Sequence, residues 1–309
     1  MRRNLIHIGY HKTATNWFQR VLYPRVENGE YLHRKRARTA FLRDSGVVLD
    51  EQGAVGALGA KGDVPLILCE EELSGNIHTG GLFGCFTREI ARRLNRVLPD
   101  SDVVIFVRNQ VDMIASVYRQ YVKEGGTYSV NRYLHHQRYL TESGFQPAKA
   151  PLFSFDHFDY AALVEFYDEL FGQERVHVYP YEAFKKDNQA FMEAYLNRFG
   201  MDVDLEALPD TRPNPPYGRG VLPLARLLNH FSRRDVLYKR YWLHVPGFYK
   251  LRGSTLKRLS KLPVLGGQIS SETLLGTKNV AFIRERYAES NRRLAHRIDY
   301  PLSDYGYPL

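Results

Sequence analysis

The first feature that suggests chemistry is a loop near the N-terminus that combines a glycine, a lysine and hydroxyl side chains. The apolar run Leu5–Ile8 predicts a buried strand, and after it come Gly9-Tyr10-His11-Lys12-Thr13-Ala14-Thr15-Asn16 and an amphipathic helix over Thr15–Leu22. In such a unit the backbone N–H groups and the helix start carry partial positive charge, and a lysine and hydroxyls close on an anion. The loop is shorter than that of nucleoside triphosphatases, because Gly9 lies only three residues before Lys12. It therefore predicts phosphate binding without ATP hydrolysis; the alternative is an ordinary turn with a lysine in solvent.

A second candidate anion site follows the predicted strand Val103–Val107. Arg108 stands at the carboxyl end of this strand, and the next helix carries Asp112 and Ser116. Ligands of open parallel sheets bind beyond the carboxyl ends of the strands, and a guanidinium group gives phosphate paired, charge-assisted hydrogen bonds. We therefore expect Arg108 and Ser116 to hold one anion. The alternative is a structural ion pair between Arg108 and Asp112.

Three consecutive carboxylates follow the predicted strand Val64–Leu68. They are Glu70, Glu71 and Glu72. A carboxylate at a strand end is placed to act as a general base toward a ligand bound there. The alternative is a solvated, acidic helix start, which the helix dipole favours.

These residues need elements that bring the strand ends together. Apolar runs of four or five residues alternate with helical patterns, as in parallel βα units. Since such runs suit strands buried on both faces, we predict an α/β fold: a P-loop-like parallel β-sheet flanked by helices on both faces, with a helical C-terminal region. The expected strands are Leu5–Ile8, Val64–Leu68, Val103–Val107 and Arg175–Tyr179, and the expected helices are Thr15–Leu22, Thr87–Val97, Val111–Lys123, Tyr160–Phe171, Asn188–Phe199 and Val280–Ile298.

The segment Pro209–Pro216 marks the expected boundary between two parts of the chain. It is rich in proline and asparagine and ends the alternation of strands and helices. We predict an α/β core over residues 1–208 and a mainly helical region over 209–309, either as two parts or as one integrated domain.

The composition is that of a globular protein. The 309 residues are 44% hydrophobic and 25% charged, which excludes a disordered or coiled-coil chain. The two cysteines cannot form a disulfide framework, and neither they nor His135, His136 and His157 show a metal-ligand spacing. No apolar stretch is long enough for a signal-peptide core or a membrane span. We expect a cytoplasmic protein, free or peripheral to the inner face of the membrane, with no metal.

The net charge of +9 is concentrated in two basic blocks. Residues 230–262 carry nine Lys or Arg against one Asp, interleaved with aromatic residues such as Trp242. This mixture predicts contact with an anionic acceptor or a membrane surface, with Trp242 and the tyrosines suited to stacking on sugars; the alternative is a helical lid with solvated charges. The acidic middle of the chain argues against nucleic acid as a partner. The other block, residues 1–49, includes Arg34, Lys35, Arg36 and Arg38, which have no assigned role.

The two phosphate motifs, in this order, resemble those of the sulfotransferases that use 3′-phosphoadenosine 5′-phosphosulfate (PAPS). The run Gly9–Thr15 is similar to their 5′-phosphosulfate loop, and Val107–Tyr118 is similar to their 3′-phosphate motif. Asn16 stands where the family usually has threonine, and Glu70 replaces a small hydroxyl residue. The resemblance covers most of the chain but is weak over 230–275. Segments similar to the bacterial, carbohydrate-acting members are Cys69–Ser74, Tyr179–Glu182, Asn291–Leu294 and Tyr305–Pro308.

The resemblance implies transfer of a sulfuryl group from PAPS to an acceptor hydroxyl by in-line displacement, with release of adenosine 3′,5′-bisphosphate (PAP). Positioning and charge stabilisation are then the main tasks of the protein. The acceptor hydroxyl would be on a carbohydrate, that is, a polysaccharide, a glycolipid or a glycosylated metabolite, bound with help from the C-terminal region. The donor-binding residues would be Gly9, His11, Lys12, Thr13, Ala14, Thr15, Asn16, Arg108 and Ser116.

The resemblance also implies catalytic roles. Lys12, with Thr13 and Thr15, would stabilise the leaving phosphate and the transferring group. Glu71 would be the base for the acceptor hydroxyl, with Glu72 and His11 as the competing candidates.

Two other functions stay open. One is a nucleotide-dependent, kinase-like phosphotransferase, which the short loop and the lack of an aspartate on an apolar strand end disfavour. The other is a catalytically silent module that binds an anion or a saccharide on the same fold.

Overall fold

The structure of the chain is a computed structural model, which describes residues 3–43, 48–62, 64–136, 152–209, 217–234, 241–260 and 262–309. These residues form two compact units that are interleaved along the chain. The first unit is Met1–Asn109, Phe155–Thr211 and Tyr287–Leu309, and the second is Gln110–Ser154 and Arg212–Arg286. From the sequence we expected a donor-binding part up to residue 208 and a part that contributes to acceptor binding after it. This functional division stays a prediction. Most of the proline-rich loop expected there, residues 210–216, lies outside the described residues.

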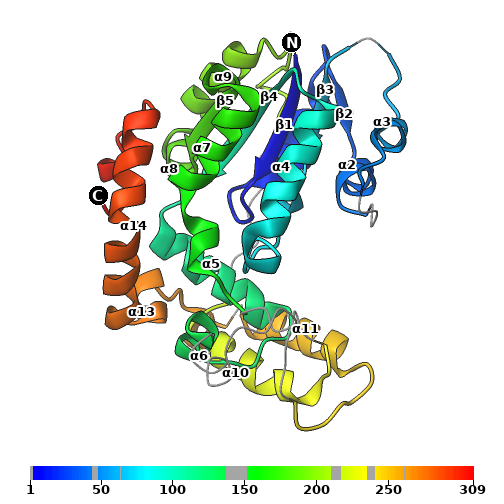
Figure 1. Cartoon of the computed structure of the whole chain (residues 1–309). Helices are drawn as coiled ribbons and strands as arrows, with labels where there is room; N and C mark the ends of the chain where they lie inside the picture. The colour runs from blue at the N-terminus through cyan, green and yellow to red at the C-terminus, as the bar shows by residue number, and fades with distance from the viewer. Residues whose placement is uncertain are drawn as a thin grey trace. The chain divides into compact units, whose positions relative to one another are not determined.

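The first unit is built on a five-stranded parallel sheet (Figure 1). Its strands are β1 (Asn4–Gly9), β2 (Glu30–Leu32), β3 (Leu66–Cys69), β4 (Ser101–Val107) and β5 (Val176–Pro180), in the order β2-β3-β1-β4-β5. Ile6 of β1 pairs with Leu68 on one side and with Val103 on the other. The four predicted strands are therefore confirmed, and the short strand β2 was not predicted.

Helices cover both faces of this sheet, because alternate residues of each central strand are buried against opposite layers. On one face, Leu5, Ile67 and Phe106 pack in a single cluster with residues of four helical segments. On the other face, helix α7 packs against β4 and β5, and α4 packs against α7. The predicted α/β fold with helices on both faces is confirmed. The helical segments named here are η1 (Phe18–Leu22), η2 (Tyr23–Arg25), α8 (Tyr181–Lys186), α9 (Asn188–Phe199), α7 (Tyr160–Phe171) and α4 (Cys85–Val97).

The remaining elements of the first unit are mostly short. The helix expected over Thr15–Leu22 is divided into one α-helical turn and the π-helical segment η1. The long C-terminal helix α14 runs through the boundary between the units. These elements are α1 (Thr15–Trp17), α2 (Arg34–Phe41), α3 (Glu51–Leu58), η3 (Glu71–Ser74), η4 (Leu82–Gly84), η7 (Phe155–Phe158), η8 (Gln173–Arg175), α14 (Thr277–Arg297) and η10 (Leu302–Tyr305).

The described part of the second unit is helical, and it confirms the predicted helical character of the C-terminal region. Asn229 holds two of its segments together, because the side-chain amide donates to the carbonyls of Val122 and Gly126 at 2.8 and 2.6 Å. None of the helices in the described ranges is long and apolar enough to cross a membrane. The helices are α5 (Gln110–Lys123), α6 (Val130–Leu134), α10 (Val221–Leu228), η9 (Asn229–Phe231), α11 (Phe248–Leu259), α12 (Pro263–Gly266) and α13 (Ser271–Leu275).

The strand order places a ligand crevice beside β1. The chain leaves β1 toward β2 and leaves β4 toward β5, so the connections diverge between these two neighbours. Parallel sheets bind ligands at such a switch point, beyond the carboxyl ends of the strands. Two backbone hydrogen bonds join the three strand ends here: Tyr10 N–H donates to Phe106 C=O at 3.1 Å, and Glu70 N–H donates to His7 C=O at 3.2 Å.

Candidate functional site

The loop after β1 is shaped by left-handed backbone at Gly9, Lys12 and Ala14, whose φ angles are 84°, 67° and 66°. At Gly9 the chain also needs the space that a missing side chain leaves. A β-carbon there would lie 3.2 Å from the Cα atom of Glu71. Glycine therefore lets the loop pass close to the start of η3, and this brings the first candidate anion site next to the candidate base.

The two buried threonines hold this loop from the inside. The hydroxyls of Thr13 and Thr15 both donate to the Tyr10 carbonyl, at 2.5 and 3.1 Å. The backbone N–H groups of residues 13–16 have no acceptor among the described residues. These residues therefore offer an anion their backbone donors, beside the exposed side chain of Lys12.

Arg108 joins the second anion motif to this loop. Its Nη1 atom donates to the Lys12 carbonyl at 3.2 Å, and its guanidinium lies over the Tyr181 ring, 5.1 Å from the ring centroid. The Arg108 carbonyl in turn accepts from the Tyr160 hydroxyl at 2.7 Å. The buried Nε atom has no hydrogen-bond partner among the described residues. A guanidinium that is fixed in place and retains a donor fits an anionic ligand.

The C-terminal end of the chain closes around the neighbour of Arg108. Glu182 accepts the Asn109 backbone N–H at 2.9 Å and the Tyr307 hydroxyl at 3.0 Å. The Asn109 side-chain amide donates to the carbonyls of Tyr305 and Gly306. Burial raises the pKa of Glu182, while these donors and the Arg108 charge lower it. The segments Tyr179–Glu182 and Tyr305–Pro308, which are far apart in sequence, thus meet at the end of β4.

Glu70 is the structural member of the acidic triplet. Its side chain is 0% exposed, and both Arg34 and Arg38 of helix α2 contact it, each with its closest nitrogen within 3 Å of the Oε2 atom. Glu70 also caps η3, because its carboxylate accepts the Glu72 backbone N–H at 3.1 Å. At this position the alternative of a solvated acidic helix start is wrong, since two arginines that had no assigned role enclose the carboxylate.

Glu71 and Glu72 differ in how firmly they are held. Glu71 accepts from Gln19 Nε2 at 2.9 Å and from Arg34 Nη2 at 3.0 Å, and its side chain is 14% exposed. Glu72 contacts Arg38 alone among the described cations and is 47% exposed. Burial raises the pKa of Glu72, and Arg38 lowers it. Of the two, Glu71 is the oriented carboxylate beside the anion loop.

His11 of this loop forms a group with two other histidines. His78 and His157 are buried and His11 is partly exposed, and each is close enough to affect the others electrostatically. Burial lowers the pKa of His11 to about 3, and the charges of Lys12 and Arg34 act in the same direction. His11 is therefore neutral near pH 7, and its lowered pKa makes it a weaker base than an ordinary histidine. Within the described residues, no group of three or more His, Cys, Asp or Glu side chains could hold a metal ion.

Ser116, the other predicted ligand of the 3′-phosphate, lies on α5 in the second unit. Its joint action with Arg108 stays a prediction. The candidate structural partner of Arg108, Asp112, accepts a hydrogen bond from Ser271 at 2.5 Å.

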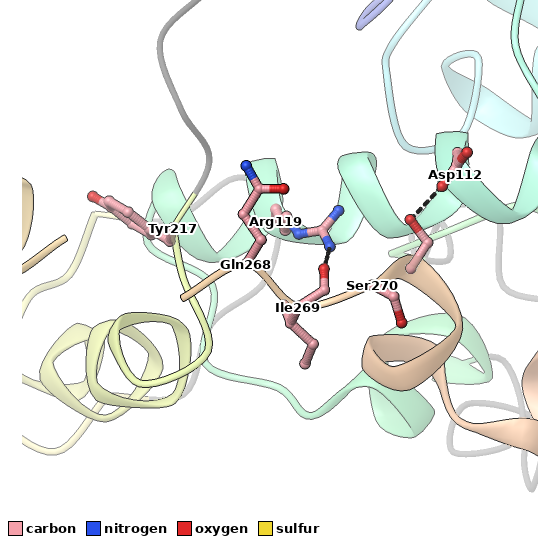
Figure 2. A pocket seen from close by; sticks show the side chains of 7 residues that line it. Asp112, Arg119, Tyr217, Gln268, Ile269 and Ser270 are labelled. Atoms are coloured by element: carbon pink, nitrogen blue, oxygen red, sulfur yellow. Dashed lines mark hydrogen bonds between the residues drawn. The ribbon is translucent and has the colours of Figure 1, made fainter. Parts of the chain in front are cut away.

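The helix that carries Ser116 borders a cavity of about 280 Å³ (Figure 2). Asp112 and Arg119, four residues before Ser116 and three after it, face this cavity, so the serine belongs to the same side of the helix. Arg119 donates to the Ile269 carbonyl at 2.7 Å, and Figure 2 shows how this bond holds the opposite wall. The lining residues are Asp112, Arg119, Tyr217, Gln268, Ile269, Ser270 and Ser271.

The first unit therefore brings together most of the residues predicted from sequence: the loop from Gly9 to Asn16, Glu71 and Arg108. Sequence reasoning missed Gln19 and Arg34, which orient Glu71, and Arg38, which neutralises Glu70. The sequence did contain a pattern from which the two arginines could have been found. Arg34 and Arg38 are spaced four residues apart, so they share one side of a helix, and the chain has an acidic triplet to match them.

Solved structures that are similar to this chain include a sulfotransferase from Alicyclobacillus acidocaldarius, with 22% sequence identity and a TM-score of 0.49 over 70% of this chain and 87% of that chain. No protein-family model and no curated protein sequence matches the chain.

Proposed function

We propose that the protein is a PAPS-dependent sulfotransferase that acts on a hydroxyl group of a carbohydrate. The main observation behind this proposal is that three features lie together at the switch point of the sheet, beside β1. They are the anion loop with its unused N–H groups, Arg108 bound to the backbone of that loop, and Glu71 packed against Gly9. A ligand with two anionic groups and an adjacent nucleophile matches these three features.

The donor residues fit the two phosphate groups of PAPS. The loop amides and Lys12 would bind the 5′-phosphosulfate, where negative charge grows on the bridging oxygen as the S–O bond breaks. Arg108, which keeps a buried donor, would bind the 3′-phosphate together with Ser116. Thr13 and Thr15 would act through their N–H groups, because their hydroxyls hold the Tyr10 carbonyl.

Glu71 is the base that the geometry favours. Gln19 and Arg34 each donate to one of its oxygens, so the carboxylate is oriented while part of it stays accessible. In the proposed step the acceptor oxygen forms a bond to sulfur, the bond from sulfur to the 5′-phosphate breaks, and the hydroxyl proton passes to Glu71. His11 is the competing base, because it is neutral and lies in the same loop as Lys12.

The cavity of the second unit supports a carbohydrate acceptor. Its lining offers an arginine, a carboxylate, an amide and two serine hydroxyls, together with the ring of Tyr217. Sugars bind through such hydrogen-bonding groups and through stacking on aromatic rings. Metal-independent transfer, with PAP as the product, completes the proposal.

The experiment that tests the donor assignment is thermal stabilisation by PAP, AMP and ATP. A ligand that binds the folded state raises the melting temperature by mass action. We expect PAP at saturation to stabilise the protein more than AMP does, and we expect Arg108→Ala to remove most of this difference. Glu206→Ala, which changes an exposed residue of the same unit, is the control.

The same experiment, together with an assay of transfer from PAPS, separates the rival functions. Stabilisation by ATP with Mg²⁺ in place of PAP would favour a phosphotransferase. Binding of PAP without transfer from PAPS to any carbohydrate hydroxyl would favour a silent binding module. Equal responses to PAP and AMP would contradict the role given to Arg108.

A further inference from the structure

We propose that the second unit carries a docking surface for anionic lipid bilayers. The surface, called here the lipid patch, consists of exposed apolar residues that lead into helix α11 and of exposed basic residues from the same segment of chain. Its apolar members are Trp242, Leu243, Val245 and Leu251, and its basic members are Arg233, Lys250, Lys257 and Arg258.

The apolar members are exposed to an unusual degree for their size. Trp242 is 67% exposed, Leu243 is 59% exposed and Leu251 is 66% exposed. Single exposed apolar residues need no explanation, but a group of large ones within ten residues of chain marks an interaction site. In the sequence this group lies between η9 and the first turn of α11, to which Leu251 belongs.

The exposed side chains stand on a backbone that is held in place. The N–H groups of Trp242 and Leu243 donate to the His230 carbonyl, at 2.8 and 3.3 Å, and Val245 N–H donates to the Phe231 carbonyl at 3.2 Å. The Trp242 ring stacks on His230 with centroids 4.5 Å apart, and Phe231 contacts Trp242 edge to face. An ordered support keeps these side chains presented, which reduces the conformational entropy lost on binding.

The charge around the apolar members has one sign. Residues 230–234, 241–260 and 262, the described part of this segment, contain six Lys or Arg and no Asp or Glu. One of the six, Arg252, is buried and donates to the Lys123 carbonyl at 2.9 Å, so its role is structural. The others are exposed and belong to the same segment of chain as the apolar residues, and their charge complements the negative surface of an anionic bilayer.

The aliphatic residues select a bilayer over a polysaccharide. A sugar face stacks on aromatic rings, and its hydroxyls need hydrogen-bonding partners, so Leu243, Val245 and Leu251 would gain little from it. At the boundary between lipid headgroups and acyl chains, these side chains leave water, and tryptophan favours that same depth. The combination of basic and apolar side chains is typical of segments that lie in a membrane interface.

Vesicle binding tests this proposal without donor, acceptor or turnover, so its outcome is independent of the proposed function. The full chain is sedimented with vesicles of phosphatidylcholine alone and of phosphatidylcholine with about one-third phosphatidylglycerol. We expect binding to the anionic vesicles only, with partitioning that weakens by about fivefold for each basic residue of the lipid patch that is neutralised. The pair Arg233→Gln and Lys250→Gln is compared with Arg88→Gln and Lys278→Gln, which are exposed elsewhere.

Tryptophan fluorescence gives a second readout that leaves the lipid patch intact. The chain has two tryptophans, Trp17 and Trp242, so in a Trp17→Phe background the emission reports Trp242 alone. We expect a blue shift with anionic vesicles and quenching by brominated lipids. Leu243→Ser with Leu251→Ser should abolish the vesicle binding of the wild-type chain, whereas Val55→Ser, at an exposed valine of α3, should not change it.

Three outcomes would overturn the proposal. They are no binding to anionic vesicles, vesicle binding with unchanged Trp242 emission, and equal loss of binding in the lipid-patch variants and the control variants. Binding to a sulfated polysaccharide that is lost in the lipid-patch variants, without vesicle binding, would reassign this surface to a polymer.

Discussion

Glu70, Glu71 and Glu72 are consecutive in the chain but face different partners. Two arginines enclose the buried Glu70, Gln19 and Arg34 orient Glu71, and the half-exposed Glu72 contacts Arg38. Although the three residues share their charge and type, we therefore expect substitutions at Glu70 to change mainly stability and substitutions at Glu71 to change mainly turnover.

The first prediction concerns this triplet. Glu71→Gln removes the proposed base, and we expect it to lower kcat by about 10²- to 10⁴-fold with the melting temperature nearly unchanged. Glu72→Gln should change kcat only a few-fold. Glu70→Ala leaves two arginines facing an empty buried site, and we expect it to cost about 3–5 kcal/mol of stability. Steady-state kinetics and urea unfolding of the three variants measure these effects.

A near-normal kcat for Glu71→Gln with a large loss in a His11→Gln variant would transfer the role of base to His11.

The second prediction concerns pH. Burial lowers the pKa of His7, His78 and His157 to about 3, whereas the unfolded chain binds these protons near pH 6.5. Stability is therefore fully present above about pH 6.5 and is lost as the pH falls toward 3. Each histidine contributes about 1.4 kcal/mol per pH unit in this window, so the three together cost about 4 kcal/mol at pH 5.5.

Urea unfolding between pH 7.5 and 5 measures this slope. His78→Gln should flatten it, and His296→Gln, at an exposed histidine, should leave it unchanged. A slope that is the same in the wild type and in His78→Gln would contradict the assignment.

At the scale of elements, the site depends on how the strand ends are tied to neighbouring segments. The loop after β1 touches η3 through Gly9, and the end of β4 is tied to α8 and to the C-terminal segment through Glu182. The position of Arg108 thus depends on residues almost two hundred positions away in sequence.

The third prediction uses the same substitution at two glycines. Gly9 has a φ of 84° and lies against Glu71, so Gly9→Ala should destabilise by about 1–2 kcal/mol and reduce turnover. Gly56 lies inside helix α3 with no atom near its missing β-carbon, so Gly56→Ala should stabilise by about 0.5–1 kcal/mol with normal turnover. Urea unfolding and initial rates measure both. Equal effects of the two substitutions would contradict the argument from backbone conformation.

At the scale of the whole molecule, the two surfaces with different proposed ligands belong to different units. The anion loop and Arg108 lie in the first unit, and the lipid patch lies in the second. The basic residues behind the net charge of +9 therefore have different surroundings. Some pair with the acidic triplet, some belong to the proposed donor site, and some lie in the segment that carries the exposed apolar side chains.

The fourth prediction is a double dissociation in amide hydrogen exchange. PAP should slow exchange at residues 10–16 and around Arg108 and leave residues 241–251 unchanged. Anionic vesicles should do the reverse. Because exchange reports local opening, the two patterns locate each ligand separately. Slowing of both segments by PAP alone would show that the two surfaces are coupled, against the independence expected here.

Local sequence patterns determined much of the fold. Apolar runs that begin at Leu5, Val103 and Val176 predict three of the strands, and the periodicity of apolar residues predicts helices such as Tyr160–Phe171. Strand β2 escaped prediction because its three residues are too few to show a period. The anion loop and Arg108 were also readable from sequence, since each stands immediately after a predicted strand.

The partners of these residues were decided only by the tertiary structure. Arg34 and Arg38 meet Glu70 across more than thirty residues, and the Tyr10 hydroxyl donates to the His157 carbonyl across 147 residues. Periodicity reports which face of an element is buried, because burial repeats with the turn of the helix or the pleat of the strand. It carries no information about which distant charge fills the space opposite. That choice depends on the path of the chain between the elements, and it separates the structural Glu70 from the candidate base Glu71.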